Sequence, residues 1–336
     1  MEKVESTSLY SRFKDLTGVH DLRVTPAGIL DSRHNDKLRE WLGEGHHASM
    51  SYMERYEALR SNPDLLLEGT KSIIVVAFNY TPDRWRDKSL PQIAAFAYGE
   101  DYHDVIRRRL LCGVELLKEQ AGGEWRICVD SAPIFERAWA ERSGLGSRCD
   151  NGLIAIPGAG TRILLAEILS TLEMEQLQNM LALPEGMTAV NEEMCLHCGA
   201  CTRSCPTGAL QTDTTVDARK CLSYQTIEHR GEWSAGFLSQ VREERIAIPL
   251  FGCDICQNVC PLNNPLLYPV TPTTISEFSP SPEILTLTAR EVLDLTQSDF
   301  SRIFKGSPIK RAKLAGIQRN ARAGIATFHR QDMNQS

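Results

Sequence analysis

The sequence predicts an α+β protein, with an α/β-type sandwich in its first part and a cysteine-rich domain behind it. Apolar, β-branched segments alternate with helical patterns over residues 1–180, and a turn-rich region with most of the cysteines covers 181–270. Residues 271–336 begin as a Pro-, Ser- and Thr-rich linker and end as a basic helical segment. Of the 336 residues, 42% are hydrophobic and 24% are charged. This composition is typical of a globular protein and excludes collagen-like, disordered and coiled-coil classes.

Three short segments are predicted to be strands. Residues 71–80 are apolar and β-branched, and a polar turn follows them from Thr81. Residues 126–130 and 152–156 have the same character. The apolar run 161–172 fits a strand or a helix, so its structure stays open at this point.

Helices are predicted at 34–44, 102–120 and 133–143, the last one starting with Pro133, a favoured early helical position. Asp130 lies between a predicted strand and this helix. Ligands often bind at the carboxyl ends of strands in α/β sheets, so Asp130 is a candidate site residue. The alternative is that it only caps the helix.

The segment 1–12 contains no apolar stretch typical of a signal peptide, and no run approaches the ~18 apolar residues of a membrane span. We therefore expect a cytoplasmic protein with no membrane partner. In the reducing cytosol, a high cysteine content indicates metal binding or redox chemistry more often than disulfides.

Eight of the eleven cysteines lie between Cys195 and Cys260. The run Cys-x-x-Cys-x-x-Cys-x-x-x-Cys-Pro over 195–206 has the spacing of bacterial ferredoxins, and 253–261 repeats its second half. In two-cluster ferredoxins the cysteine before proline binds the other cluster. The sequence therefore predicts two [4Fe–4S] clusters, with cluster 1 held by Cys195, Cys198, Cys201 and Cys260, and cluster 2 by Cys205, Cys221, Cys253 and Cys256.

Cys221 enters the second set because it is the only remaining cysteine in the region. Zinc and a disulfide framework are the alternatives, but the triple spacing and the two Cys-Pro endings fit iron–sulfur clusters better. The other three cysteines are expected to be small apolar residues. Two clusters beside a separate domain imply that electrons are supplied to a redox site in that domain.

No phosphate-binding motif is complete in the first domain. Asp101-Tyr102-His103 resembles the start of the Asp-x-His-x-x-Gly motif of cobalamin proteins, but Ile106 stands at the glycine position. A histidine ligand to cobalt is therefore not supported.

Several segments together resemble the epoxyqueuosine reductases, a family that carries out the last step of queuosine synthesis in tRNA. The similarity runs from about residue 10 to the end of the chain. It rests on both cysteine motifs and on the segments 97–103, 129–133 with Arg137, 141–146, 251–261 and 307–311.

The resemblance implies an oxidoreductase with a nitroreductase-like, cobalamin-binding first domain, two [4Fe–4S] clusters, a tRNA substrate and a small redox protein as electron donor. A monomer is expected. Asp130 matches the proton donor of the family, and Arg137 matches a position near the substrate. The residues that match corrinoid-lining positions are Arg60, Asn151, Leu165, Ser223, Cys253 and Asp254. Ser147 and Asp150 depart from the family, which commonly has an aromatic residue and Lys there.

The implied reaction consumes two electrons and two protons and converts an epoxide into an alkene and water. A carboxylic acid must keep its proton near neutral pH to protonate the departing oxygen. We therefore expect burial beside an apolar cofactor to raise the pKa of Asp130.

The last segment, 301–336, contains eight Lys or Arg residues and one acidic residue. Such a charge excess suits the phosphates of tRNA, and a solvated helix face is the alternative. Rival interpretations of the whole chain are a reductive dehalogenase, a ferredoxin-like electron carrier and a zinc-binding RNA module. Reductive dehalogenases typically carry a twin-arginine export signal, and none is visible here.

Overall fold

The computed structural model describes residues 8–183, 193–211 and 214–332, with side chains up to residue 325. Its main sheet has the strand order β1-β2-β6-β3, and every neighbouring pair is antiparallel. The strands are β1 Asp21–Pro26, β2 Ser72–Asn79, β3 Trp125–Cys128 and β6 Ile163–Ser170. An antiparallel sheet with helices packed on it is α+β, as predicted.

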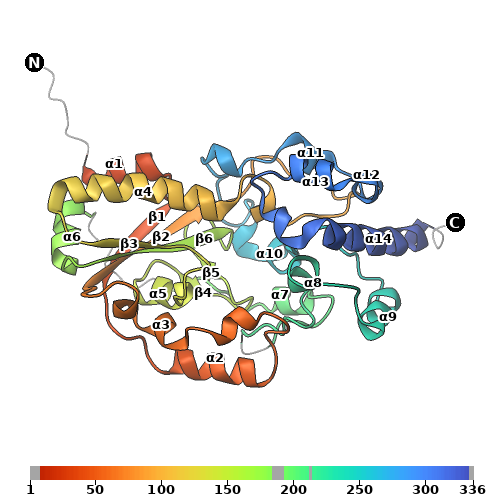
Figure 1. Ribbon diagram of the computed structural model, residues 1–336, viewed down its shortest axis with the longest axis horizontal. Helices are drawn as coiled ribbons and strands as arrows, with labels where there is room; N and C mark the ends of the chain where they lie inside the picture. The colour runs from red at the N-terminus through yellow and green to blue at the C-terminus, as the bar shows by residue number, and fades with distance from the viewer. Residues whose placement is uncertain (1–7, 184–192, 212–213, 333–336) are drawn as a thin grey trace, which may run out of the picture.

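Helices cover both faces of the sheet (Figure 1). One layer contains α1 Leu9–Thr17, α4 Tyr102–Ala121 and α6 Met174–Leu181, and the other contains α2 Arg33–Gly43, α3 Glu57–Ser61 and α5 Glu136–Arg142. All eight residues of β2 are buried, because Phe78 packs towards Phe13 of α1 while Val75 packs towards Trp139 of α5. Burial on both faces explains the uninterrupted apolar sequence of this strand.

The predicted strands at 71–80 and 126–130 are confirmed, and the open segment 161–172 forms strand β6. The strand expected at 152–156 shrinks to β5 Ile154–Ala155, which pairs with β4 Ser147–Arg148 outside the main sheet. Strand β1 was not predicted. It is an edge strand in which Arg23 and other half-exposed side chains interrupt the apolar pattern.

All three predicted helices are present as α2, α4 and α5. The described part of the cysteine-rich region contains four short helices, which are α7 Ala200–Arg203, α8 Leu222–Ile227, α9 Ala235–Glu243 and α10 Ile255–Asn258. Short 3-10 turns join the elements: η1 Ser51–Glu54, η2 Pro63–Leu65, η3 Ala95–Ala97, η4 Pro261–Asn263, η5 Ser276–Phe278 and η6 Pro308–Ala312. None of the described helices is long and apolar enough to cross a membrane.

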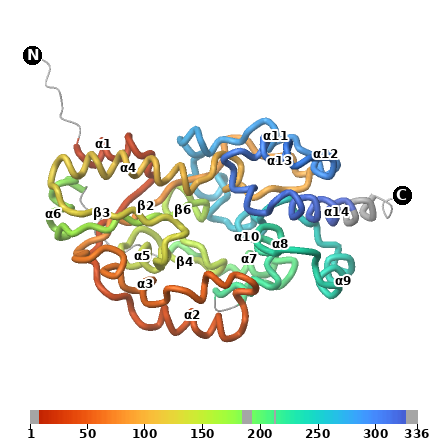
Figure 2. The backbone as a smooth tube through the Cα atoms, viewed as in Figure 1, coloured from red at the N-terminus to blue at the C-terminus, as the bar shows by residue number. Residues whose placement is uncertain are grey.

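The last part of the chain forms α11 Pro282–Thr286, α12 Ala289–Asp294, α13 Gln297–Ile303 and α14 Lys313–Asp332. The predicted basic helical segment is therefore present, and its last helix, α14, has 20 residues. This segment is packed into the molecule (Figure 2): Phe304 and Ile317 share a core with Ile93 and Phe251. The tail therefore joins the first domain to the cysteine region.

Two polar side chains of α14 attach it to the cysteine region. Asn320 is fully buried and donates to the carbonyls of Thr226 and Leu250 over 2.9 and 2.8 Å. Arg319 is also buried, donates to the Gln225 carbonyl over 2.7 Å and lies against the Trp233 ring. Arg319 is therefore a structural residue and is not available to phosphate.

Replacing Asn320 by leucine is expected to lower the free energy of unfolding by about 3 kcal/mol, because two buried carbonyls lose their donor. Urea denaturation of the anaerobic protein measures this change. Arg322→Gln, on the exposed side of the same helix, is the control and should change stability by less than about 0.5 kcal/mol. Equal stability of the two variants would contradict the assigned role of Asn320.

Candidate active site and cluster sites

The candidate active site lies where α4 begins and β3 ends. Asp101 caps α4 by accepting the backbone N–H of His103, and this places the His103 ring beside Asp130. His103 Nε2 lies 2.8 Å from Asp130 Oδ2, and its Nδ1 lies 2.7 Å from Asp101 Oδ1. The Tyr102 hydroxyl donates to the same oxygen of Asp130 over 2.5 Å. Asp130 has a φ of 40°, a left-handed conformation that Asp and Asn adopt more readily than most residues.

Hydrogen bonds decide the charges in this group. Burial raises the pKa of Asp130, but the hydrogen bonds from His103 and Tyr102 outweigh it and hold that pKa below its ordinary value. Burial lowers the pKa of His103, but the carboxylates of Asp101 and Asp130 raise it to about 9. The proton therefore lies on His103 near neutral pH. This corrects the expected raised pKa of Asp130, because its half-exposed carboxylate accepts hydrogen bonds that favour the charged form.

Two glutamates lie close to Asp130. Glu136, the first residue of α5, accepts the backbone N–H of Asp130 over 2.7 Å. Burial, together with the charge of Asp130, raises the pKa of Glu136 to about 8. Glu167 of β6 is fully buried opposite Cys128, and its carboxyl oxygens have no hydrogen-bond partner among the described residues. Burial, and the charge of Glu136 when that group is ionised, raise the pKa of Glu167 and favour its protonated form.

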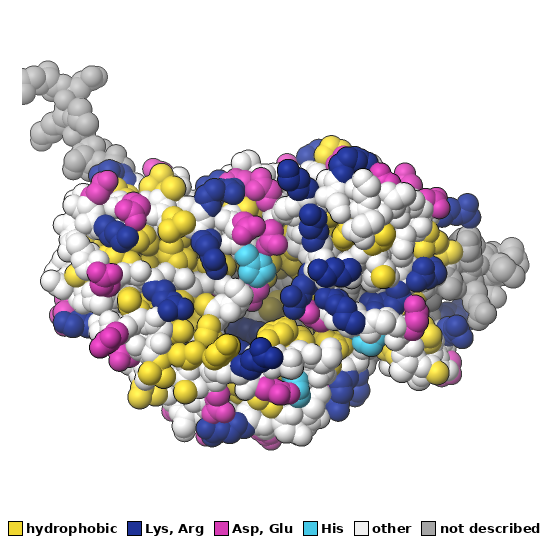
Figure 3. Space-filling model, viewed as in Figure 1, with side chains coloured by type: hydrophobic (Ala, Val, Ile, Leu, Met, Phe, Trp, Pro, Cys, Tyr) yellow, Lys and Arg dark blue, Asp and Glu magenta, His cyan; other side chains and the backbone are white. Residues whose placement is uncertain are grey.

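Residues from distant parts of the chain face the same site. Burial raises the pKa of Tyr52, and the charges of Glu228 and Asp130 raise it further, which places all three groups close together. Arg311 of η6 makes two 2.8 Å contacts with Glu228, the residue that follows α8, and lies 6.0 Å from the centroid of the Tyr52 ring. Figure 3 shows one face of the molecule, with a hollow near its centre that Lys and Arg side chains border.

The structure brings the four predicted ligands of cluster 1 together. Their side chains line one cavity, which Cys149 and Leu262 also border. Burial raises the pKa of Cys149, and Cys195 and Cys260 raise it further, so this residue lies beside the ligand set. A fifth thiol at this site was missed because Cys149 belongs to no cysteine motif in the sequence.

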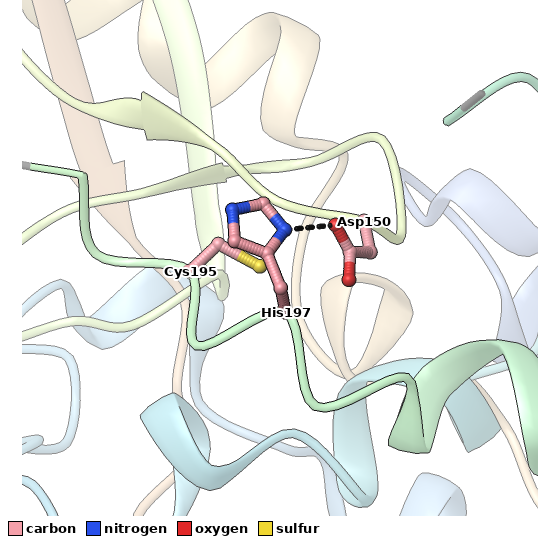
Figure 4. A group of neighbouring side chains, drawn as sticks. All are labelled: Asp150, Cys195 and His197. Carbon is pink, nitrogen blue, oxygen red and sulfur yellow. Dashed lines mark hydrogen bonds and ion pairs between the residues drawn. The ribbon is translucent and has the colours of Figure 1, made fainter. Parts of the chain in front are cut away.

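Asp150 and His197 stand beside cluster 1 (Figure 4). His197 Nδ1 lies 2.7 Å from Asp150 Oδ1, and its Nε2 lies 2.7 Å from Glu193 Oε1. Asp150, His197 and Cys195 lie close enough to hold a metal ion together. Because Cys195 already belongs to the cluster 1 set, we assign this trio to the same site. Asp150, one of the two positions expected to depart from the family, thus pairs with a histidine in this chain.

The predicted ligands of cluster 2 also lie near one another. Burial raises the pKa of Cys256 to about 12, and the nearby thiols of Cys221 and Cys205 contribute to this rise. Burial also raises the pKa of Cys253, again with a contribution from Cys221. Cys221, which was assigned to cluster 2 by elimination, therefore lies close to the other cysteines of this set.

The residues predicted to hold a corrinoid present suitable groups. Arg60 Nε and Asn151 Nδ2 are buried and have no hydrogen-bond partner among the described residues, so they offer donors to a ligand. Leu165 lies in the half-exposed first part of β6, and Ser223 lies on α8. The Asp254 carboxylate accepts the backbone N–H of Ala95 over 2.7 Å, which fixes the loop at Cys253 to η3. Polar donors and apolar surface fit a large macrocycle with polar edges.

Arg137 donates to the Gly152 carbonyl over 2.7 Å, and its charge acts on Asp130. It therefore lies near the proposed proton donor, Asp130. The sequence did not indicate Tyr102, His103, Glu136 or Glu167 as site residues. His103 was considered only as a metal ligand, and the glutamates belong to no motif.

A double set of four cysteines beside a polar site at the edge of an α+β sandwich defines an iron–sulfur oxidoreductase. The family model described as "4Fe-4S double cluster binding domain" matches residues 194–263, and "Epoxyqueuosine reductase QueG, DUF1730" matches residues 60–131. The chain belongs to the epoxyqueuosine reductase family and carries two [4Fe–4S] clusters.

Curated relatives and solved structures agree with this assignment. Epoxyqueuosine reductase of Cyclobacterium marinum is 36% identical over 84% of this chain and 86% of its own length. The enzyme of Synechococcus sp. (strain RCC307) is 33% identical over 87% and 84%. A crystal structure of epoxyqueuosine reductase with an epoxyqueuosine-modified tRNA stem loop is 29% identical, with a TM-score of 0.80 over 95% of this chain and 80% of that one.

Proposed function

We propose that this protein reduces the epoxide of epoxyqueuosine in tRNA to the alkene of queuosine. One observation supports this proposal most strongly. Asp130, His103 and Arg137 lie near one another, and the domain that follows them carries two [4Fe–4S] clusters. Its relatives bear this activity in their name, and one solved relative binds an epoxyqueuosine-modified tRNA stem loop.

The proposal includes a cobalamin held by Arg60, Asn151, Leu165, Ser223, Cys253 and Asp254. When bound, the clusters supply single electrons and the cobalamin supplies a reducing centre that collects two of them. The chain itself supplies protons. His103 Nε2 shares its proton with Asp130 Oδ2, and that carboxyl passes it to the oxygen that leaves the epoxide carbon. Arg137, fixed by the Gly152 carbonyl, holds a positive charge near this oxygen.

The direct test is mass spectrometry of tRNA from cells that lack the gene. We expect epoxyqueuosine to accumulate and the queuosine signal to disappear, and both to be restored by the intact gene. Unchanged queuosine would refute the proposed function. The intracellular location and the monomeric state that we propose are tested by cell fractionation and by sedimentation.

The rate of epoxide reduction is expected to fall as the pH rises through about 9. The proton on His103 is retained below this pH and lost above it, since the pKa of His103 is raised to about 9. Asp101, Tyr102 and Glu136 surround the same pair, so the measured pKa belongs to the group as a whole. Single-turnover rates between pH 6 and 10 measure this dependence.

His103→Gln is the matched variant, because glutamine still donates a hydrogen bond to Asp130 but does not titrate. Its rate should be lower near neutral pH and should lack the fall near pH 9. A variant with the same alkaline fall as the wild type would show that His103 is not the titrating group.

Three lysines at the end of the chain are proposed to contact tRNA phosphates. Lys305, Lys310 and Lys313 are exposed and form no ion pair within the described residues, whereas Arg311 pairs with Glu228. Replacing all three by glutamine is expected to lower the slope of log affinity against log salt by roughly 2–3. Fluorescence titration of tRNA between 50 and 200 mM salt, about the range over which such slopes are read, measures it.

The control for this experiment removes three lysines from the opposite part of the molecule, namely Lys14, Lys71 and Lys118. Both variants carry the same change of net charge. If both reduce the salt slope equally, the effect comes from overall charge and the tail contacts are refuted.

A further inference from the structure

Exposed apolar side chains gather around cluster 1. Eleven large apolar side chains of the described residues are exposed, and four of them flank the cysteines of this cluster. Leu196 follows Cys195 and Val259 precedes Cys260, while Leu266 and Leu267 are 90% and 63% exposed. We call these four side chains the apolar face. Exposed apolar patches of this kind mark interaction sites more often than isolated side chains do.

The two chain segments that carry the apolar face are neighbours. Met194, Cys195 and Cys260 pack around the same small core as Tyr268, so the segments 194–196 and 259–268 are neighbours. Three charged groups next to these segments pair with one another, since His197 bonds to Asp150 and Glu193. This pairing lowers the net local charge beside the apolar face.

Cluster 1 is the cluster that a partner can reach. Cys198 is exposed, and Cys195 is half-buried at the edge of the cavity. The loop of Cys253 in the second set is fixed to the first domain, because Asp254 accepts the N–H of Ala95. Electrons from outside therefore enter at cluster 1 and continue through cluster 2 towards the active site.

We propose that the apolar face docks a reduced protein electron carrier. This inference rests on the proposed function only in that the clusters must be recharged for each turnover. Each encounter transfers one electron from the carrier, which is oxidised, to cluster 1, which is reduced, and no bond is made or broken. Two encounters deliver the two electrons that the epoxide consumes.

The small size of the apolar face favours a transient carrier over a second copy of this chain. Stable interfaces use about 20–30 residues on each side, whereas weak electron-transfer encounters bury the least surface. Four apolar side chains over an exposed cluster fit the second case. A carrier with an apolar surface around its own redox centre brings the two centres closest when these surfaces meet.

The test compares two reductants of cluster 1 in the anaerobic holoprotein. The variant Leu266→Glu with Leu267→Glu places charge on the most exposed part of the apolar face. A flavodoxin serves as the protein donor and dithionite as the small reductant, and stopped-flow absorbance follows the reduction of the clusters. Ile29→Glu, which introduces the same kind of charge at a 71% exposed residue elsewhere, is the control.

We expect the double variant to raise the KM for flavodoxin about fivefold to tenfold and to leave the dithionite rate unchanged. The control should match the wild type with both reductants. A KM within twofold of the wild type would overturn the proposal, as would equal slowing with dithionite, which would place the defect in the cluster. A wild-type dimer in sedimentation that the double variant dissociates would also overturn it.

This readout is independent of tRNA. If the protein reduces another substrate, the clusters still accept electrons and the docking result stands. If only the docking assignment is wrong, tRNA from the gene-deletion strain still shows accumulated epoxyqueuosine.

Discussion

Replacing Asp130 by asparagine is expected to lower kcat by ~10²–10⁴-fold, the usual contribution of a general acid. Asparagine has the size of the carboxylate and tolerates the left-handed backbone at this position, so the loop keeps its shape. It cannot, however, take the proton of His103 and pass it on. The epoxide oxygen would then leave as an alkoxide, which is a poor leaving group.

Single-turnover conversion of epoxyqueuosine tRNA by the dithionite-reduced protein isolates this step. Iron content and tRNA affinity should equal those of the wild type, which excludes a folding defect. The pKa of His103 should fall as well, because one of its two carboxylate partners has become neutral. A kcat within threefold of the wild type would refute the proposed role of Asp130.

Glu136 provides a second check on the same loop. Its carboxyl accepts the Asp130 N–H, an interaction that the amide oxygen of Glu136→Gln preserves. We assign Glu136 as a positioning residue because its carboxyl holds the backbone of Asp130. The Glu136→Gln variant is therefore expected to keep most of the activity that Asp130→Asn loses.

The cysteine sets illustrate what a sequence can determine. Ligand spacing is local, and the Cys-Pro endings fix which cluster each motif completes, so the spacing alone predicts seven of the eight ligands. Counting then places Cys221 with Cys205 and Cys256, and the fold brings these thiols together. The position of Cys149 beside cluster 1 could not be predicted in this way, because the β4–β5 turn brings it close to Cys195.

The protonation state of Asp130 could not be predicted in the same way. The sequence shows an acid at the end of an apolar strand, which suggests burial and a raised pKa. The opposing hydrogen bonds come from Tyr102 and His103, which are 28 and 27 positions away and reach it only because Asp101 starts α4 there. Electrostatics at a site are set by tertiary contacts, and a single sequence does not contain these.

The topology shows a similar limit. The apolar run of β2 resembles a strand of a parallel sheet, which is buried on both faces. Here the sheet is antiparallel, and two layers of helices bury both faces of β2. The basic tail was interpreted from its charges, whereas Phe304, Ile317 and the buried Arg319 fix it to the core. Charge alone therefore overstated how much of the tail is free for RNA.

The second large effect is expected from Cys221→Ala. This cysteine was assigned to cluster 2 by elimination, and alanine removes the ligand without adding a polar atom. We expect anaerobic preparations to contain about half of the wild-type iron, since each of the two [4Fe–4S] clusters holds four iron atoms. Turnover should be undetectable with any donor, because in the proposed electron path cluster 2 connects cluster 1 to the active site.

Cys149→Ala is the matched control for this prediction. Cys149 borders the cluster 1 cavity, but the four cysteines of that set already satisfy the cluster, so its loss should leave the iron content and turnover unchanged. The two variants together separate a ligand from a neighbouring thiol. Half of the iron after Cys149→Ala would contradict the assignment of this thiol as a mere neighbour of cluster 1. Full iron after Cys221→Ala would refute Cys221 as a ligand, and cluster 2 would then need a fourth ligand from outside its motifs, which supply only Cys205, Cys253 and Cys256.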